Sequence, residues 1–311
     1  TVGELNIESK GIADLSGIED FTELNILNCR YNNLSQLYLS NNKNLKKLKC
    51  DHNNITSLVV SVLSDLEVLW CHTNNIFVIN VTNNHKMRDL RIVGNKIRQI
   101  DLSKNPDLEI FTCQLLNEVS TLDVSKNTKL RILQIPGSNL EEIDVSNHPF
   151  LYNLYLKGNK LTHLDLSNNP NLKNLHCSRN NLVNLDLTSN PEIWHLNCEY
   201  NQLVSLNVKN GNNTNIKYFK AKHNPDLNCI QVDDSVWSYF NWAEGVDPWV
   251  YFGENCGGWT TDSDGDGVDD EYDDFPENPD AAFQNYFPAS GVGSLAFEDL
   301  WPGKGDYDFN D

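Results

Sequence analysis

A repeat of about 21 residues constrains the fold of this chain more than any other feature of its sequence. The segments LKKLKCDHNNI (Leu45–Ile55), LYNLYLKGNKL (Leu151–Leu161) and LKNLHCSRNNL (Leu172–Leu182) share the pattern L-x-x-L-x-L-x-x-N-x-L. Its second leucine, or a phenylalanine in that place, recurs at Leu27, Leu48, Leu69, Leu90, Phe111, Leu133, Leu154, Leu175, Leu196 and Phe219. Self-similarity at a short, fixed period predicts a solenoid in which each repeat forms one coil.

A second half-repeat lies between these segments, as in LDVS (122–125) and LDLS (164–167). Apolar residues alternate in both halves, which is typical of short strands. The 10 or 11 residues in each half leave no room for a helix. We therefore expect a mainly β, right-handed solenoid of about ten coils with little helix. Its first-half strands should line the concave side, and the second halves should form extended segments or turns on the convex side.

Two columns of polar residues keep strict phase with the repeat. The first column is Asn32, Asn53, Asn74, Asn95, Asn159, Asn180, Asn201 and Asn224. An inward amide can both donate and accept, so it can satisfy the buried backbone of the next coil. We expect the same role on the other edge for Ser40, Ser61, Thr82, Ser103, Ser125, Ser146, Ser167 and Thr188. Leu116 and Ser138 interrupt the asparagine column, which predicts a bulge or a change of curvature near 114–138.

The repeat spacing and the opening segment LSGIEDFTEL (Leu15–Leu24) resemble bacterial cell-surface leucine-rich repeat proteins of the internalin type. The resemblance covers roughly residues 1–227 and implies the fold, but it does not specify a ligand. We expect an N-terminal cap with an opening repeat at 1–24, leucine-rich repeats at 25–227, a C-terminal cap at 228–259, a connector at 260–282 and a tail at 283–311.

The eight cysteines fall into two classes. Six of them occupy the inward column where other repeats carry Ile or Leu: Cys29, Cys50, Cys71, Cys113, Cys177 and Cys198. We interpret these as small buried hydrophobic residues. Neighbouring strand residues point to opposite faces, so a pair such as Cys71 and His72 is not expected to share a zinc ion. Cys229 and Cys256 lie outside the repeats, and a bridge between them would close the aromatic-rich cap and imply an oxidising, extracellular compartment.

The outward strand positions vary freely while the inward ones do not, which is typical of a scaffold that displays a binding surface. One outward column contains Lys49, Trp70, Arg91, Tyr155 and His176. Trp70 and Tyr155 are the candidate anchors, because large aromatic residues are frequent binding hot spots. Stacking on a sugar would use the same residues, so the ligand can be a protein or a glycan.

Charge and motifs exclude several functions. Residues 1–227 carry 23 acidic and 23 basic residues, whereas residues 228–311 carry 20 acidic residues and one lysine. No basic field is available to attract nucleic acid. No apolar run approaches the ~18 residues of a membrane span. We found no nucleophile elbow, P-loop or zinc-protease motif, so we expect a non-enzymatic protein.

The acidic segment from Asp262 to Asp273 reads as a twelve-position calcium loop. Oxygen-bearing residues occupy positions 1, 3, 5, 9 and 12, a glycine stands at position 6, and position 7 can offer its carbonyl. This is the register of an EF-hand loop, whose oxygens suit calcium. The predicted ligands are Asp262, Asp264, Asp266, Val268, Asp270 and Asp273, with a second site possible from Asp269, Asp274, Asn278 and Asp280. A disordered acidic spacer is the alternative.

The flanks of this loop resemble a thrombospondin type 3 repeat, although Phe275 replaces the customary cysteine. The tail from Leu295 resembles the start of a bacterial surface domain of the LruC type. Together these features predict a secreted or cell-surface bacterial module for recognition or adhesion, stiffened by structural calcium. A polysaccharide-binding accessory module and a purely structural spacer are the alternatives.

Overall fold

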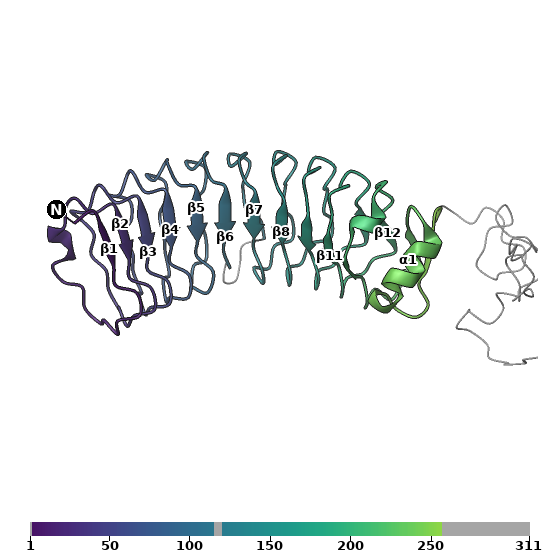
Figure 1. Ribbon diagram of the computed structural model, residues 1–311, viewed down its shortest axis with the longest axis horizontal. Helices are drawn as coiled ribbons and strands as arrows, with labels where there is room; N and C mark the ends of the chain where they lie inside the picture. The colour runs from purple at the N-terminus through teal and green to yellow at the C-terminus, as the bar shows by residue number, and fades with distance from the viewer. Residues whose placement is uncertain (1, 115–119, 257–311) are drawn as a thin grey trace, which may run out of the picture. The chain divides into compact units, whose positions relative to one another are not determined.

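The computed structural model describes residues 2–114 and 120–256 (Figure 1). The chain divides into two units, Thr1–Glu254 and Asn255–Asp311. The first unit contains every helix and strand given below. The expected calcium connector and the tail lie outside the described residues.

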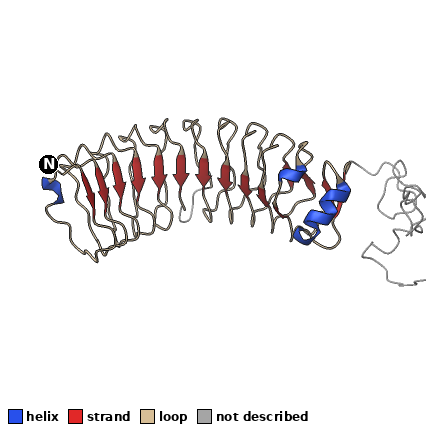
Figure 2. Ribbon diagram, in the orientation of Figure 1, coloured by secondary structure: helices blue, strands red, loops and turns tan. Residues whose placement is uncertain are grey.

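An eleven-stranded parallel sheet runs along this first unit, seen as the row of red arrows in Figure 2. Each strand has three residues, and neighbouring strands pair in register, with Leu27 opposite Leu48 and Leu48 opposite Leu69. The strands are β1 (Glu4–Asn6), β2 (Ile26–Asn28), β3 (Lys47–Lys49), β4 (Val68–Trp70), β5 (Asp89–Arg91), β6 (Ile110–Thr112), β7 (Ile132–Gln134), β8 (Asn153–Tyr155), β9 (Asn174–His176), β11 (His195–Asn197) and β13 (Tyr218–Lys220). The solenoid is therefore confirmed, with one strand more than expected because β1, in the predicted cap, also joins the sheet.

The core consists of the inward residues of every coil. The central residue of each strand from β2 to β13 is buried, and so are most of the inward apolar residues of the second half-repeats. The six repeat cysteines are buried and free, and burial raises the pKa of each thiol. They are thus neutral, apolar core residues, as their alternation with Ile and Leu predicts.

The second half-repeats form a ladder at the C-terminal end of the first unit. A four-stranded sheet joins β10 (Asn184–Asp186), β12 (Ser205–Asn207), β14 (Cys229–Gln231) and β15 (Tyr251–Gly253). In earlier described coils these segments are extended without strand pairing. The Ser103 N–H, for example, donates to the Asp101 side chain at 2.9 Å, and the same turn recurs in three following coils. This turn does not by itself prevent pairing, because the Thr188 N–H makes the same bond to Asp186 at the end of β10, which does pair with β12.

The asparagine column forms the expected ladder. Asn53 Nδ2 donates to the carbonyls of Cys29 and Cys50 at 3.0 Å each, and its Oδ1 accepts from the Leu34 N–H at 3.0 Å. Equivalent bonds form at the other seven asparagines. Ser138, at the interruption, is buried, whereas Leu116 lies outside the described residues. The expected bulge near 114–138 falls partly on that segment, and the strands on either side, Ile110–Thr112 and Ile132–Gln134, still pair in register.

The prediction that a column of Ser and Thr residues forms a second ladder in the second half-repeats was wrong. The eight Ser and Thr residues are exposed or half-buried there. The buried column is a second set of asparagines two residues further on: Asn42, Asn84, Asn105, Asn127, Asn169 and Asn190. Asn169, for example, donates to the carbonyls of Val145 and His148 at 3.0 Å each. Asparagine reaches two carbonyls of the preceding coil at once, which a serine hydroxyl, with one proton, cannot do.

An aromatic cap closes the C-terminal end of the described solenoid. It contains α1 (Ser235–Trp242), the one α-helix among the described residues, and η3 (Ala243–Gly245); shorter turns η1 (Ile18–Asp20) and η2 (Asn213–Asn215) precede it. Asp234 caps the N-terminus of α1, and its carboxylate accepts from the Trp237 N–H at 2.8 Å. The Trp242 ring stacks on Phe219 with a centroid distance of 4.4 Å. Only part of the expected aromatic set is buried.

The exposed aromatic residues of the cap are Tyr239, Phe240 and Trp249, whereas Trp242 and Phe252 are buried. A short helix can turn only one face toward the coils, so the Tyr239 and Phe240 rings of α1 are left exposed. Cys229 and Cys256 are both disulfide-bonded, while the other six cysteines are free. The expected disulfide is therefore confirmed.

Candidate recognition surface

The outer side of the eleven-stranded sheet, called the sheet face below, is the side that we expected to be concave. Lys49, Trp70 and Arg91 stand opposite one another on β3, β4 and β5. Tyr155 and His176 are paired on β8 and β9. The predicted residues therefore fall into two patches, separated by β6 and β7.

Trp70 is the centre of the first patch. Lys49 Nζ lies 4.0 Å from its ring centroid, Arg91 Cζ lies 4.5 Å from it and Arg30 Cζ lies 5.5 Å from it. The indole Nε1 donates to Asp89 Oδ2 at 2.9 Å. The ring is half-buried rather than freely exposed, because each cation over an aromatic face is attracted to it.

The acidic residues of this patch lie beneath its cations. Asp89 accepts two hydrogen bonds from Arg91, at 2.9 and 3.0 Å, and its side chain is 14% exposed. Asp51 is completely buried, and Arg30 Nε lies 2.8 Å from both of its carboxylate oxygens. The surface offered to a ligand is therefore mainly cationic and aromatic. We define the N-terminal patch as Arg30, Lys49, Asp51, Trp70, Asp89 and Arg91.

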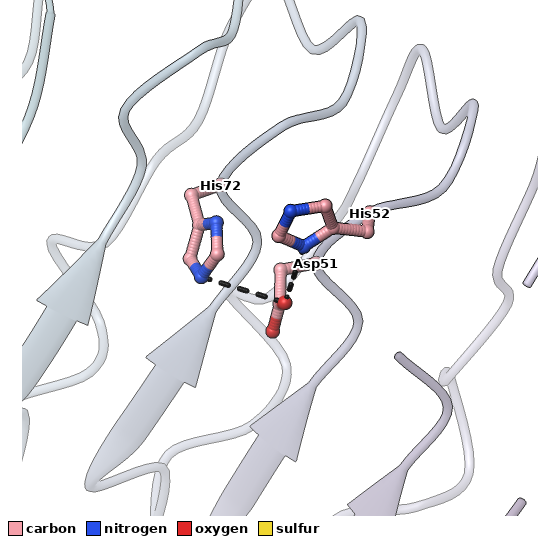
Figure 3. A group of neighbouring side chains, drawn as sticks. All are labelled: Asp51, His52 and His72. Carbon is pink, nitrogen blue, oxygen red and sulfur yellow. Dashed lines mark hydrogen bonds and ion pairs between the residues drawn. The ribbon is translucent and has the colours of Figure 1, made fainter. Parts of the chain in front are cut away.

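Two histidines adjoin this patch at Asp51 (Figure 3). His52 Nδ1 lies 2.9 Å and His72 Nε2 lies 3.4 Å from Asp51 Oδ2. The His52 ring also stacks on Tyr31 at 4.2 Å and meets His72 edge-on at 5.0 Å. Burial lowers the pKa of His72, with smaller contributions from neighbouring charges. Asp51 and His52 are not among the binding residues predicted from the sequence, although Asp51 stands in an outward column beside Arg30 and His72.

The second patch is a row of rings across β8, β9, β11 and β13, formed by Tyr155, His176, His195 and Tyr218. Successive ring centroids are 4.3, 6.4 and 4.1 Å apart. We call this row the C-terminal patch. Burial, helped by Lys157 and by His195 and Lys220, lowers the pKa of His176 to about 4. His176 Nε2 lies 2.9 Å from Ser178 Oγ.

Solved structures with this architecture include internalins. The chain is similar to the functional domain of InlJ from Listeria monocytogenes, which includes a cysteine ladder, with 28% identity and a TM-score of 0.66 over 80% of this chain and 62% of that one. The fold is a leucine-rich repeat solenoid. The internalin InlF of Listeria monocytogenes matches with 22% identity and a TM-score of 0.62, over 74% of this chain and 75% of that chain.

A leucine-rich repeat protein of Leptospira interrogans matches with 20% identity and a TM-score of 0.57, over 71% of this chain and 59% of that one. The chain spans less than two thirds of the InlJ structure, of which it covers 62%. No protein-family model matches the chain, and no curated protein does. Within its described part, no helix has the length and apolar character that a bilayer crossing requires.

The predicted metal ligands from Asp262 to Asp280 lie outside the described residues. The calcium site therefore stays a prediction from the sequence.

Proposed function

We propose that this chain is an extracellular, non-enzymatic recognition or adhesion module that binds a protein ligand through the sheet face. Its leucine-rich repeat fold and its likeness to internalins support a protein-interaction module. The disulfide at Cys229 and Cys256 supports an oxidising compartment outside the cytoplasm.

The layered charge of the N-terminal patch carries the proposal. Lys49 and Arg91 flank the Trp70 ring, whereas Asp51, paired with Arg30, is buried and Asp89, paired with Arg91, is nearly so. Held in place by these contacts, Trp70 loses little side-chain freedom when it binds. Pre-ordered Trp and Arg residues are the usual centres of protein interfaces. The complementary ligand is a protein surface that offers carboxylates around an apolar centre.

A binding screen tests the proposal. The calcium-loaded protein is applied to arrays of extracellular proteins and of glycans, and the hits are measured again with the Trp70→Ala variant. We expect protein hits whose affinity falls at least about tenfold, since hot-spot truncations cost ~2 kcal/mol or more. Phe77→Ala is the matched control, because Phe77 is an exposed ring beneath Lys96 that lies outside the strands of the sheet.

The alternative ligand is a polysaccharide, and the C-terminal patch favours it. Its four rings form a row across β8 to β13, which could stack on successive sugars. Glycan hits that disappear in Tyr155→Ala and persist in Trp70→Ala would replace the protein proposal with this one. Cell attachment that stays unchanged when the whole outward column is substituted would instead favour a structural spacer.

We also propose that the connector between Asp262 and Asp273 binds structural calcium. The twelve-position register of its carboxylates supports this. Calorimetry should show calcium binding that Asp264→Asn weakens by removing one charged ligand. Binding no tighter than millimolar, or equal binding by the variant, would instead favour an acidic spacer.

A further inference from the structure

Asp51, His52 and His72 form a compact group of metal-type donors. One donor atom from each residue lies within 4.8 Å of the other two. Within the described part of the chain, this is the single group of three or more His, Cys, Asp or Glu side chains with that geometry. The recognition proposal rests on Trp70 and its cations and does not use these histidines.

The repeat and one turn bring the three residues together. Asp51 and His72 are 21 residues apart and follow paired strands β3 and β4 at the same position, so their side chains are neighbours. His52 follows Asp51 directly and has a φ of 54°, in the left-handed region. Consecutive residues of a strand point to opposite faces, but this turn directs His52 back toward Asp51, as Figure 3 shows.

The distances suit a small ion with nitrogen and oxygen ligands. Ligand atoms bound to zinc at about 2.1 Å in a tetrahedron lie about 3.4 Å from one another. Asp51 Oδ2 is 3.4 Å from His72 Nε2 and 2.9 Å from His52 Nδ1. A shift of a few tenths of an ångström in the His52 ring would therefore open the second distance to the required value.

Neighbouring side chains hold two of the three donors in place. Arg30 bonds both oxygens of Asp51, and it can keep Oδ1 when Oδ2 turns to a metal. Such outer contacts orient a ligating carboxylate. The Tyr31 ring, stacked on His52 at 4.2 Å, limits the tilt of that imidazole.

We propose that Asp51, His52 and His72 bind a divalent transition metal, with zinc as the best match, at the edge of the N-terminal patch. Imidazole nitrogens select zinc, copper or nickel over calcium and magnesium. Three protein ligands leave a fourth position for water or for a group of the bound partner. The half-exposed His52 and His72 rings open this position to solvent.

Metal titration tests the proposal directly. The full chain, held in saturating calcium to occupy the acidic connector, is titrated with Zn²⁺ against a chromophoric chelator and separately with Co²⁺ by absorption spectroscopy. We expect one equivalent to bind, with visible cobalt bands and without the near-ultraviolet thiolate bands that the cysteines would give. His72→Ala and Asp51→Asn should each lower the zinc affinity at least about tenfold.

His176→Ala is the matched control, because His176 is a half-buried histidine of the same sheet face whose neighbours are Ser178, Tyr155 and His195 rather than a carboxylate. It should bind zinc as the unmodified protein does. Circular dichroism and thermal unfolding show whether each variant is folded. His72→Ala that is folded and binds zinc unchanged would overturn the proposal, as would the unmodified chain failing to bind zinc or cobalt. Asp51 would then be only the partner of Arg30.

Discussion

Removal of one ladder amide should destabilise the protein far more than removal of an exposed amide with a similar bond. Asn180 is buried, and its Nδ2 donates to the carbonyls of Leu156 and Cys177 at 3.0 and 2.9 Å. Its Oδ1 accepts from the Leu161 N–H at 3.0 Å. The Asn180→Ala variant therefore leaves three backbone groups of two adjoining coils without these partners.

The expected loss follows from those three groups. Each buried polar group without a partner costs about 1–3 kcal/mol, and a water that enters the space left by the amide would recover part of this. We expect Asn180→Ala to lower the free energy of unfolding by about 3–5 kcal/mol. Asn171→Ala is the control: its Nδ2 also donates to a carbonyl of the preceding coil, at 2.8 Å to Pro149, but on the surface. It should cost about 0.5 kcal/mol or less.

Urea unfolding followed by circular dichroism gives both values. A repeat array can unfold in parts, so amide hydrogen exchange should accompany it and show faster exchange in the coils around Asn180. Equal stabilities of Asn180→Ala and Asn171→Ala would refute the reasoning, because burial of the ladder would then contribute nothing.

Three further predictions concern other parts of the chain. Reduction of the disulfide at Cys229 and Cys256 should lower the free energy of unfolding by about 3–4 kcal/mol in the chain-entropy model, measured with and without reductant; equal values would contradict it. The pKa of His176 is lowered from 6.5 to about 4, so the unfolded chain binds the proton first and stability should fall as the pH drops through this interval. His176→Gln should flatten that dependence in melting curves, and an unchanged slope would count against it. Gly245→Ala should cost about 1–3 kcal/mol in urea unfolding, because its Cβ would lie 2.3 Å from the Phe219 carbonyl oxygen, and a neutral effect would disprove the close approach.

The period of the repeat was enough to predict the solenoid, the register of the strands and the asparagine ladder. These features depend on residues that recur in phase, such as Leu48 and Asn53. The same pattern in neighbouring repeats therefore supports the assignment of each coil. The second ladder was also in phase, at residues such as Asn105. It was missed because Ser103 and its equivalents looked equally regular, and sequence alone did not show that their N–H groups bond to local aspartates.

The donor group around Asp51 could not be predicted by strand alternation. That rule places His52 and Asp51 on opposite faces, and it holds only while the backbone stays extended. The left-handed conformation of His52 breaks the rule. The same turn recurs in other coils, with glycine at Gly94 and Gly158 but with side chains at Tyr31, Thr73, Arg179 and Tyr200. The residue type at this phase therefore does not reveal the turn.

The most direct test of the recognition proposal is hydroxyl-radical footprinting of the chain with and without a protein captured in the screen. The proposal predicts that binding protects Trp70 from oxidation and leaves Phe77 and Tyr38, which are exposed outside the strands of the sheet, oxidised as before. Undiminished oxidation of Trp70 together with protection of Phe77 or Tyr38 would contradict it, because the ligand would then bind outside the sheet face.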